Sequence, residues 1–149
     1  MIIKKATKLE KKQGLKIAAE LKEWFTPEGL KNIEIDFNMN SVIVAKEESN
    51  IIGFLCYTSY SGKMLLLWMG VARSYQRKGI GKALLLHLEN IARKLKFNSI
   101  EVETLPDEDS YEPYKLTRAF YYKNGFKRVL YKKARIEGWD DQIILEKAL

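Results

Sequence analysis

Residues 71–85 read Val-Ala-Arg-Ser-Tyr-Gln-Arg-Lys-Gly-Ile-Gly-Lys-Ala-Leu-Leu, and this stretch decides the fold. The almost wholly apolar run from Lys63 to Ala72 leads into it and is typical of a central strand covered on both faces. Beyond it, apolar residues recur at intervals of three and four and predict an amphipathic helix: Ile80, Leu84, Leu88, Ile91 and Leu95. A basic loop with two glycines therefore joins a buried strand to the start of a helix.

This loop has the composition of an anion-binding site. The first N–H groups of a helix are unpaired and carry partial positive charge, and glycines let the backbone approach a ligand closely. Arg77, Lys78 and Lys82 add further positive charge. Gly79 and Gly81 are one residue apart with no Lys-Ser/Thr after them, so the loop is neither a P-loop nor a three-glycine dinucleotide fingerprint. A pyrophosphate is the ligand that suits it best.

Strand and helix patterns alternate along the rest of the chain. Thr7-x-x-Glu10 is a capping box that opens a helix, and Thr26-Pro27 opens a second one. The last predicted helix, from Tyr114 to Lys123, ends at Asn124-Gly125. The other segments are predicted strands: 1–6, 41–46, 51–60, 63–72, 98–105, 126–136 and 142–149. The order β-α-α-β-β-β-α-β-α-β-β predicts an α/β (α+β) fold, in which helices flank a mixed sheet. No linker divides the chain, so we expect a single domain over residues 1–149.

Composition excludes several classes of protein. With one cysteine and one histidine among 149 residues, neither a disulfide nor a zinc or other His-based metal site is expected. The apolar runs are too short for a membrane span and the N-terminus lacks a signal-peptide pattern, which predicts a cytoplasmic protein without a membrane partner. The net charge of +7 favours an anionic partner. Nucleic acid is the weaker choice, because no nucleic-acid-binding motif is present.

Two motifs resemble the GNAT superfamily of acetyl-CoA-dependent N-acetyltransferases. Gln76-Arg-Lys-Gly-Ile-Gly81 matches the three fixed positions of Gln/Arg-x-x-Gly-x-Gly/Ala at a strand-to-helix junction. Phe120-Tyr-Tyr-Lys-Asn-Gly-Phe126 matches the aromatic-Tyr-x-x-x-Gly-Phe segment that ends the next helix in that family. The order of elements agrees over nearly the whole chain. The resemblance implies a mostly antiparallel sheet that splays open between two central parallel strands and holds acetyl-CoA there, with no metal.

The resemblance also implies residue roles. The backbone of Met69 and Val71 is expected to bind the pantetheine arm, at an opening of the sheet that typically lies at a β-bulge. Tyr121 is the implied general acid, and a phenol of pKa ~10 stays protonated at neutral pH and can donate to a leaving thiolate of pKa ~8.5. Tyr122 lies on another face of the helix. The pyrophosphate is expected on the backbone N–H groups of the loop: Gln76, Arg77, Lys78, Gly79, Ile80, Gly81 and Lys82.

Two glutamates are candidates for the general base. Many family members carry a base-like Glu on the strand before the glycine loop, but residues 63–68 contain no carboxylate. Other members use the middle of a Leu-Glu-Val-like triplet, which Ile100-Glu101-Val102 matches. Glu101 is therefore the candidate base, acting through water, with Glu103 second. The alternative is that both lie on a solvated strand face and pair with lysines.

The predicted function is transfer of an acetyl group from acetyl-CoA to a primary amine. We expect direct attack in a ternary complex, because Cys56 is not placed as an acyl carrier. The acceptor stays open between a small molecule and a protein N-terminus or lysine. A non-catalytic acyl-CoA-binding or sensing module and, more weakly, a nucleic-acid-binding protein are the alternatives. The strands from Phe126 to Leu149 are candidates for a homodimer edge, and the basic residues between Lys123 and Arg135 for contacts to the phosphates of coenzyme A.

Overall fold

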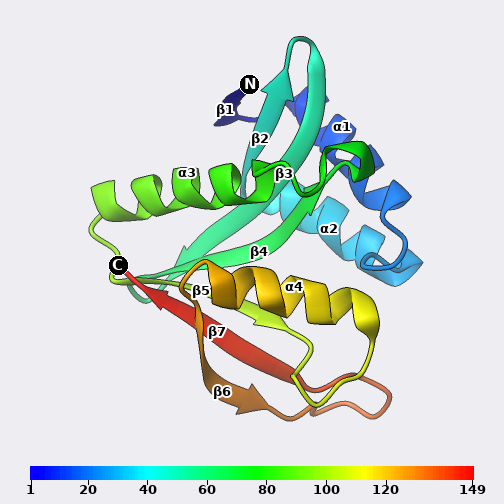
Figure 1. Ribbon diagram of the computed structural model, residues 1–149, viewed down its shortest axis with the longest axis vertical. Helices are drawn as coiled ribbons and strands as arrows, with labels where there is room; N and C mark the ends of the chain where they lie inside the picture. The colour runs from blue at the N-terminus through cyan, green and yellow to red at the C-terminus, as the bar shows by residue number, and fades with distance from the viewer.

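Seven strands form one sheet, in the order β1-β2-β3-β4-β5-β7-β6, in the computed structural model, which describes residues 1–149 (Figure 1). Every neighbouring pair is antiparallel except β4 and β5, which are parallel. The strands are β1 (Ile2–Lys5), β2 (Ser41–Glu47), β3 (Asn50–Tyr60), β4 (Lys63–Val71), β5 (Ser99–Thr104), β6 (Lys127–Lys132) and β7 (Gln142–Ala148). The predicted α/β class, with its parallel pair in a mostly antiparallel sheet, is confirmed.

Helices cover the two faces of this sheet. They are α1 (Lys8–Glu20), α2 (Pro27–Met39), α3 (Ile80–Lys94) and α4 (Glu112–Lys123), with a short 3-10 turn η1 (Arg73–Tyr75). The predicted capping box opens α1, and the Thr26 hydroxyl accepts the Gly29 N–H at 3.0 Å at the start of α2. No helix combines the length and the apolar character needed to cross a bilayer.

The sheet separates two apolar cores. Ile43 and Ala45 of β2 join the core beneath α3, whereas Val42 and Val44 join the core beneath α1 and α2. Successive strand residues point to opposite faces, so a strand covered on both sides must be apolar throughout. This explains the unbroken apolar runs of the central strands.

The sheet opens between β4 and β5. Only Lys63–Leu66 of β4 pair with Ser99–Val102 of β5. Beyond these residues β4 stays paired with β3 and β5 with β7, so the two strands separate (Figure 1). The register between β3 and β4 shifts at the same point, because Cys56 pairs with Trp68 and Tyr57 with Leu66, which leaves Leu67 as an extra residue. A bulge bends the strand that contains it, and β4 accordingly turns away from β5 beyond Leu66. The expected opening at a bulge is therefore confirmed.

Two predicted boundaries of the last helix and the strand after it differ from the structure by two residues or more. The strand expected over 126–136 ends at Lys132, because the Asp141 carboxylate accepts the Ala134 N–H at 2.7 Å and so draws the chain into a turn. Helix α4 starts at Glu112, two residues before the predicted Tyr114, with Pro113 in its first turn. Proline is tolerated there because the first N–H groups of a helix have no partner within it.

Candidate active site

The glycine loop presents free backbone N–H groups at the start of α3. Arg77 and Gly79 both adopt left-handed backbone conformations, with φ of +61° and +81°. None of the N–H groups from Arg77 to Lys82 donates to another backbone group. No side chain caps α3, and its first turn contains no acidic residue. These donors and the positive end of the helix dipole are therefore available to an anion.

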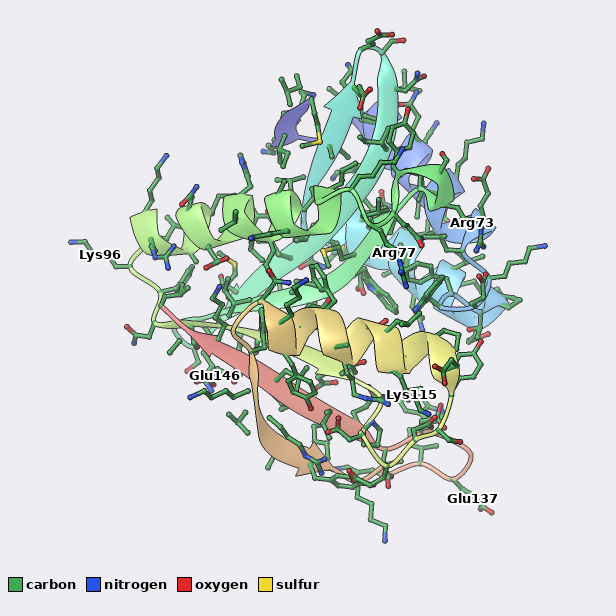
Figure 2. All side chains as sticks on the ribbon, in the orientation of Figure 1. Arg73, Arg77, Lys96, Lys115, Glu137 and Glu146 are labelled. Carbon is green, nitrogen blue, oxygen red and sulfur yellow. The ribbon has the colours of Figure 1, made fainter.

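A cavity of about 750 Å³ lies against this loop, between the end of β4 and the last turns of α4. Figure 2 shows Arg77 in the space between the start of α3 and α4. Lys78 is the predicted cofactor-binding residue that does not line the cavity, and its ammonium group lies 5.6 Å from the centre of the Tyr75 ring. The others all line it: Met69, Val71, Gln76, Arg77, Gly79, Ile80, Gly81 and Lys82. We call this space the cofactor cavity.

The end of β4 turns part of its backbone toward the opening. The Ala72 N–H donates to the Ile52 carbonyl of β3 at 2.8 Å. Because hydrogen-bonding groups alternate along a strand, Met69 and Val71 direct theirs away from β3. The Val71 carbonyl accepts the Gln76 side-chain amide at 3.0 Å. Gln76 therefore has a side-chain role, holding the loop to the strand, that the sequence did not indicate.

Tyr121 is buried at the edge of the cofactor cavity. Its ring makes T-shaped contacts with Phe120 and Phe126, at centroid distances of 5.4 and 5.2 Å. Only 4% of the residue is exposed, and burial raises the pKa of its hydroxyl above the ordinary value. The Tyr122 hydroxyl instead donates to the Asp107 carboxylate at 2.8 Å. Of the two neighbouring tyrosines, only Tyr121 lines the cavity.

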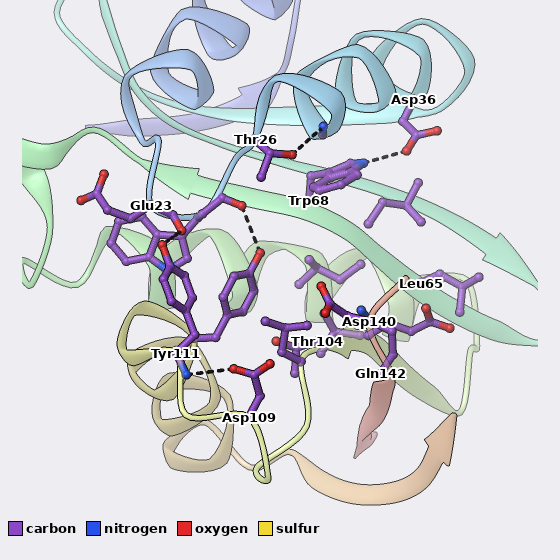
Figure 3. Close-up of a pocket in the computed structure, with 18 of the residues that line it drawn as sticks. Glu23, Thr26, Asp36, Leu65, Trp68, Thr104, Asp109, Tyr111, Asp140 and Gln142 are labelled. Atoms are coloured by element: carbon purple, nitrogen blue, oxygen red, sulfur yellow. Dashed lines mark hydrogen bonds between the residues drawn. The ribbon is translucent and has the colours of Figure 1, made fainter. Parts of the chain in front are cut away.

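A second cavity, of about 810 Å³, lies where β4 and β5 part (Figure 3). Trp24 lines both cavities, so the two cavities are neighbours at this residue. The Trp24 indole N–H donates to the Pro113 carbonyl at 3.0 Å, and the Tyr111 hydroxyl donates to the Glu23 carbonyl at 2.8 Å. These bonds tie the segment after α1 to the start of α4. The sequence did not indicate this second cavity, because its walls come from segments about 90 residues apart.

Both candidate bases line the second cavity, and both are paired with lysines. Glu101, whose side chain is 16% exposed, accepts the Lys63 ammonium at 2.7 Å, and this bond raises the pKa of Lys63. Glu103, about half exposed, accepts Lys132 at 2.7 Å. The sequence left open whether these glutamates act as bases or lie on a solvated strand face. Their place in the cavity fits the first alternative, and their pairing with lysines fits the second.

The basic residues after α4 do not gather at the glycine loop. Arg128 pairs with Asp107 and Glu108, at 3.0 and 2.6 Å. Of the basic residues between Lys123 and Arg135, only Lys123 lines the cofactor cavity. Within this cluster, only Lys123 therefore lies where it could contact a coenzyme held at the glycine loop, since β6 lies at the outer edge of the sheet.

No group of three or more His, Cys, Asp or Glu side chains is arranged to hold a metal ion.

Comparison with known proteins identifies the family. Residues 38–128 match the family model described as an acetyltransferase (GNAT) domain. Among solved structures, an acetyltransferase assigned to the GNAT family from Desulfovibrio desulfuricans has a TM-score of 0.84 at 23% identity, covering 99% of this chain and 98% of that one. An aminoglycoside 6'-N-acetyltransferase complexed with coenzyme A has a TM-score of 0.74 at 19% identity, with 99% and 97% coverage.

The ribosomal-protein-S18-alanine N-acetyltransferase from Escherichia coli has a TM-score of 0.77 at 18% identity, with 99% and 92% coverage. At these identities the structures show a shared fold. A search of curated protein sequences finds no match. Because the family model covers more than half of the residues, the chain belongs to the GNAT family of acetyltransferases.

Proposed function

We propose that the protein transfers the acetyl group of acetyl-CoA to a primary amine in a ternary complex. The observation that carries this proposal is the pair of neighbouring cavities that both border Trp24, one at the glycine loop and one where the sheet opens. One cavity contains the unpaired N–H groups of the glycine loop, and carboxylates and aromatic rings line the other. A donor in the first and an acceptor in the second would meet at the opening.

The hydrogen-bond donors of the cofactor cavity match the acceptor groups of coenzyme A. The free N–H groups from Arg77 to Lys82 would hold the pyrophosphate, with added charge from Lys82 and Lys123. The N–H groups of Met69 and Val71 would bind the pantetheine arm or the developing oxyanion. Acetyl-CoA would supply the acetyl group as a thioester, which is already activated toward amines.

The proposed reaction balances with two proton transfers. The lone pair of a neutral amine attacks the thioester carbonyl, and a C–N bond replaces the C–S bond. Tyr121 donates its proton to the departing sulfur, and its raised pKa keeps it protonated at neutral pH. The proton lost by the amine nitrogen passes to Glu101 through water.

Direct attack is favoured because Cys56 is inaccessible. The residue has no exposed surface and lies in the core beneath α1 and α2. Burial raises the pKa of its thiol to about 12, so the nucleophilic thiolate is scarce at neutral pH. An acyl-cysteine intermediate would need a different thiol, and the chain has none.

The first test is thermal unfolding with acetyl-CoA, with ATP and NAD as control ligands. At 100 times the dissociation constant, binding adds ~2.7 kcal/mol of stability, which raises the Tm by ~5–10 °C in a domain of this size. No shift with acetyl-CoA would overturn the proposal. A shift without thiol release across a panel of amines would indicate an acyl-CoA sensor instead.

The base is tested with a pair of variants. Glu101→Gln should lower kcat by about 100-fold or more, whereas Glu103→Gln should change it little. Equal effects would remove Glu101 from the proposed mechanism.

A further inference from the structure

We propose that the second cavity binds an acceptor carrying at least two positive charges, so that the substrate is a small di- or polyamine. The identity of the reacting amine rests on the proposed function. The binding of the cation does not, and it can be measured without turnover.

The charge of the second cavity is opposite to that of the chain. The protein carries a net charge of +7, yet Lys22 is the one basic residue that lines this cavity. Six carboxylates line it: Glu23, Asp36, Glu101, Glu103, Asp109 and Asp140. A concentration of negative charge on a basic protein favours a cationic ligand, because the local field attracts the opposite sign.

Three of these carboxylates are already neutralised by partners within the chain. Glu23 pairs with Arg73 at 2.7 Å, and Glu101 and Glu103 pair with the lysines described above. The other three, Asp36, Asp109 and Asp140, form no ion pair with any basic side chain. Two or more ammonium groups of a ligand could pair with them.

The unpaired carboxylates occupy two walls of the cavity (Figure 3). Asp36 lies on α2 and accepts the Trp68 indole N–H at 2.7 Å. Asp109 and Asp140 belong to the loops before α4 and β7, and the Asp109 carboxylate accepts the Tyr111 N–H at 2.8 Å. Leucines and aromatic rings lie between these walls. A ligand with ammonium groups joined by an apolar chain matches this order, and the rings can also face a cation.

Thr104 provides an independent sign of a ligand. Its buried hydroxyl oxygen has no hydrogen-bond partner, and the residue is 4% exposed. Thr104 is one of the residues that line the second cavity (Figure 3). Buried hydroxyls are nearly always hydrogen-bonded, so an unpaired one in a residue that lines a cavity points to a missing donor or acceptor. An ammonium N–H in the cavity could donate to it.

Size favours a small molecule over a protein segment. About 810 Å³ is within the range of small-molecule sites. A protein N-terminus brings one ammonium group followed by neutral peptide units, which would leave one wall without a partner. We therefore infer that the ligand is a small cation, and binding of a peptide tests the alternative of a protein N-terminus.

The experiment is titration calorimetry of the full chain, with and without coenzyme A. The central comparison is 1,4-diaminobutane against n-butylamine, which has the same carbon chain and one ammonium group fewer. A linear triamine and a polyaminated sugar distinguish the two sources of polycations, and a tripeptide with a free α-amine represents a protein N-terminus. We expect the diamine to bind about tenfold or more tightly than butylamine, because a hydrogen bond to a charged group is strong. Equal binding, or tighter binding of the peptide, would overturn the proposal.

Isosteric variants locate the effect. Asp140→Asn and Asp36→Asn should each reduce the preference for the diamine over butylamine by about tenfold. Glu137→Gln is the matched control, since it removes one charge from the same exposed loop without lining the cavity. If Glu137→Gln reduces the preference as much as Asp140→Asn does, general surface charge explains the binding and the proposed site is wrong.

Thr104→Val separates a ligand contact from a structural role. Removing an unpaired buried hydroxyl should raise the Tm of the free protein and also weaken diamine binding. A higher Tm with unchanged diamine affinity would contradict the proposed contact. If diamines bind as expected but no amine is acetylated, the proposed function fails and the cation site stands.

Discussion

Replacing Tyr121 with phenylalanine removes one oxygen atom from the proposed active site and leaves its packing in place. The ring would keep its contacts with Phe120 and Phe126, at 5.4 and 5.2 Å. The hydroxyl makes no hydrogen bond within the chain, so none is lost. We therefore expect the unfolding free energy and the binding free energy of acetyl-CoA to change by no more than ~0.5 kcal/mol, about a twofold change in Kd.

Turnover should respond very differently. Loss of a positioned proton donor typically costs ~10²–10⁴ in rate, which is ~3–5 kcal/mol of transition-state stabilisation. Because burial raises the pKa of Tyr121, its protonated form persists as the pH rises, and wild-type kcat should not fall between about pH 7 and 9 through loss of this proton. The measurement is single-turnover thiol release, followed with a thiol-reactive dye.

Tyr122→Phe is the matched control for this experiment. It removes the same atom from the next residue, whose hydroxyl contacts Asp107 outside the cofactor cavity. Its rate should stay within about threefold of the wild type. The proposed acid role is refuted if Tyr121→Phe retains this rate as well, or if both variants lose turnover equally.

Three further outcomes follow from the packing and charges of the fold. Gly70→Ala would place a Cβ 2.7 Å from Cε1 of the buried Phe54 ring. We therefore expect the free energy of unfolding to fall by ~1–3 kcal/mol, which lowers the Tm by ~2–4 °C for each kcal/mol. An unchanged Tm in calorimetry would contradict this packing. Gly79→Ala should lower the free energy of unfolding by ~1–2 kcal/mol through backbone strain at φ +81° alone, because no atom lies within 4 Å of the added Cβ. Gly79→Asn should recover part of that stability in denaturant unfolding, since Asn tolerates the left-handed conformation better. Lys4, the Thr7 backbone N–H and Lys46 together hold the pKa of Glu10 at about 2, below its ordinary 4.5, so its contribution to stability is present above pH 4.5 and lost as the pH falls toward 2. Between those pH values the Tm of the wild type should therefore fall more steeply than that of Glu10→Gln, and parallel curves would show that the ion pairs do not stabilise the fold.

Features that depend on a few neighbouring residues were predictable from the sequence. The capping box at Thr7, the helix start at Thr26-Pro27 and the glycine loop before α3 all appear where their patterns place them. Gly125, with φ of +94°, follows the Asn124 cap of α4 as expected. Backbone sterics and local hydrogen bonds decide such features within one turn of chain, so the residues that form them are adjacent in the sequence.

The position of the sheet opening came from family resemblance and not from the residue pattern alone. The apolar run of β4 continues to Val71 without a break, and nothing in it marks Leu67 as the extra residue. A bulge is set by the registers that two strands reach against their partners. Those registers depend on packing on both faces of the sheet.

The amino-acid sequence by itself determined the anion-ready loop and the order of elements, and its resemblance to a known family pointed to Tyr121. The acidic cavity was decided only by tertiary structure, because Asp36, Asp109 and Asp140 come from segments that share no pattern and meet only when α2, α4 and the two sheet halves pack. The same holds for the bond from Trp24 to Pro113, which spans 89 residues. Spacing along a chain encodes local geometry, whereas the distance between remote side chains is set by how the cores on the two faces of the sheet fill.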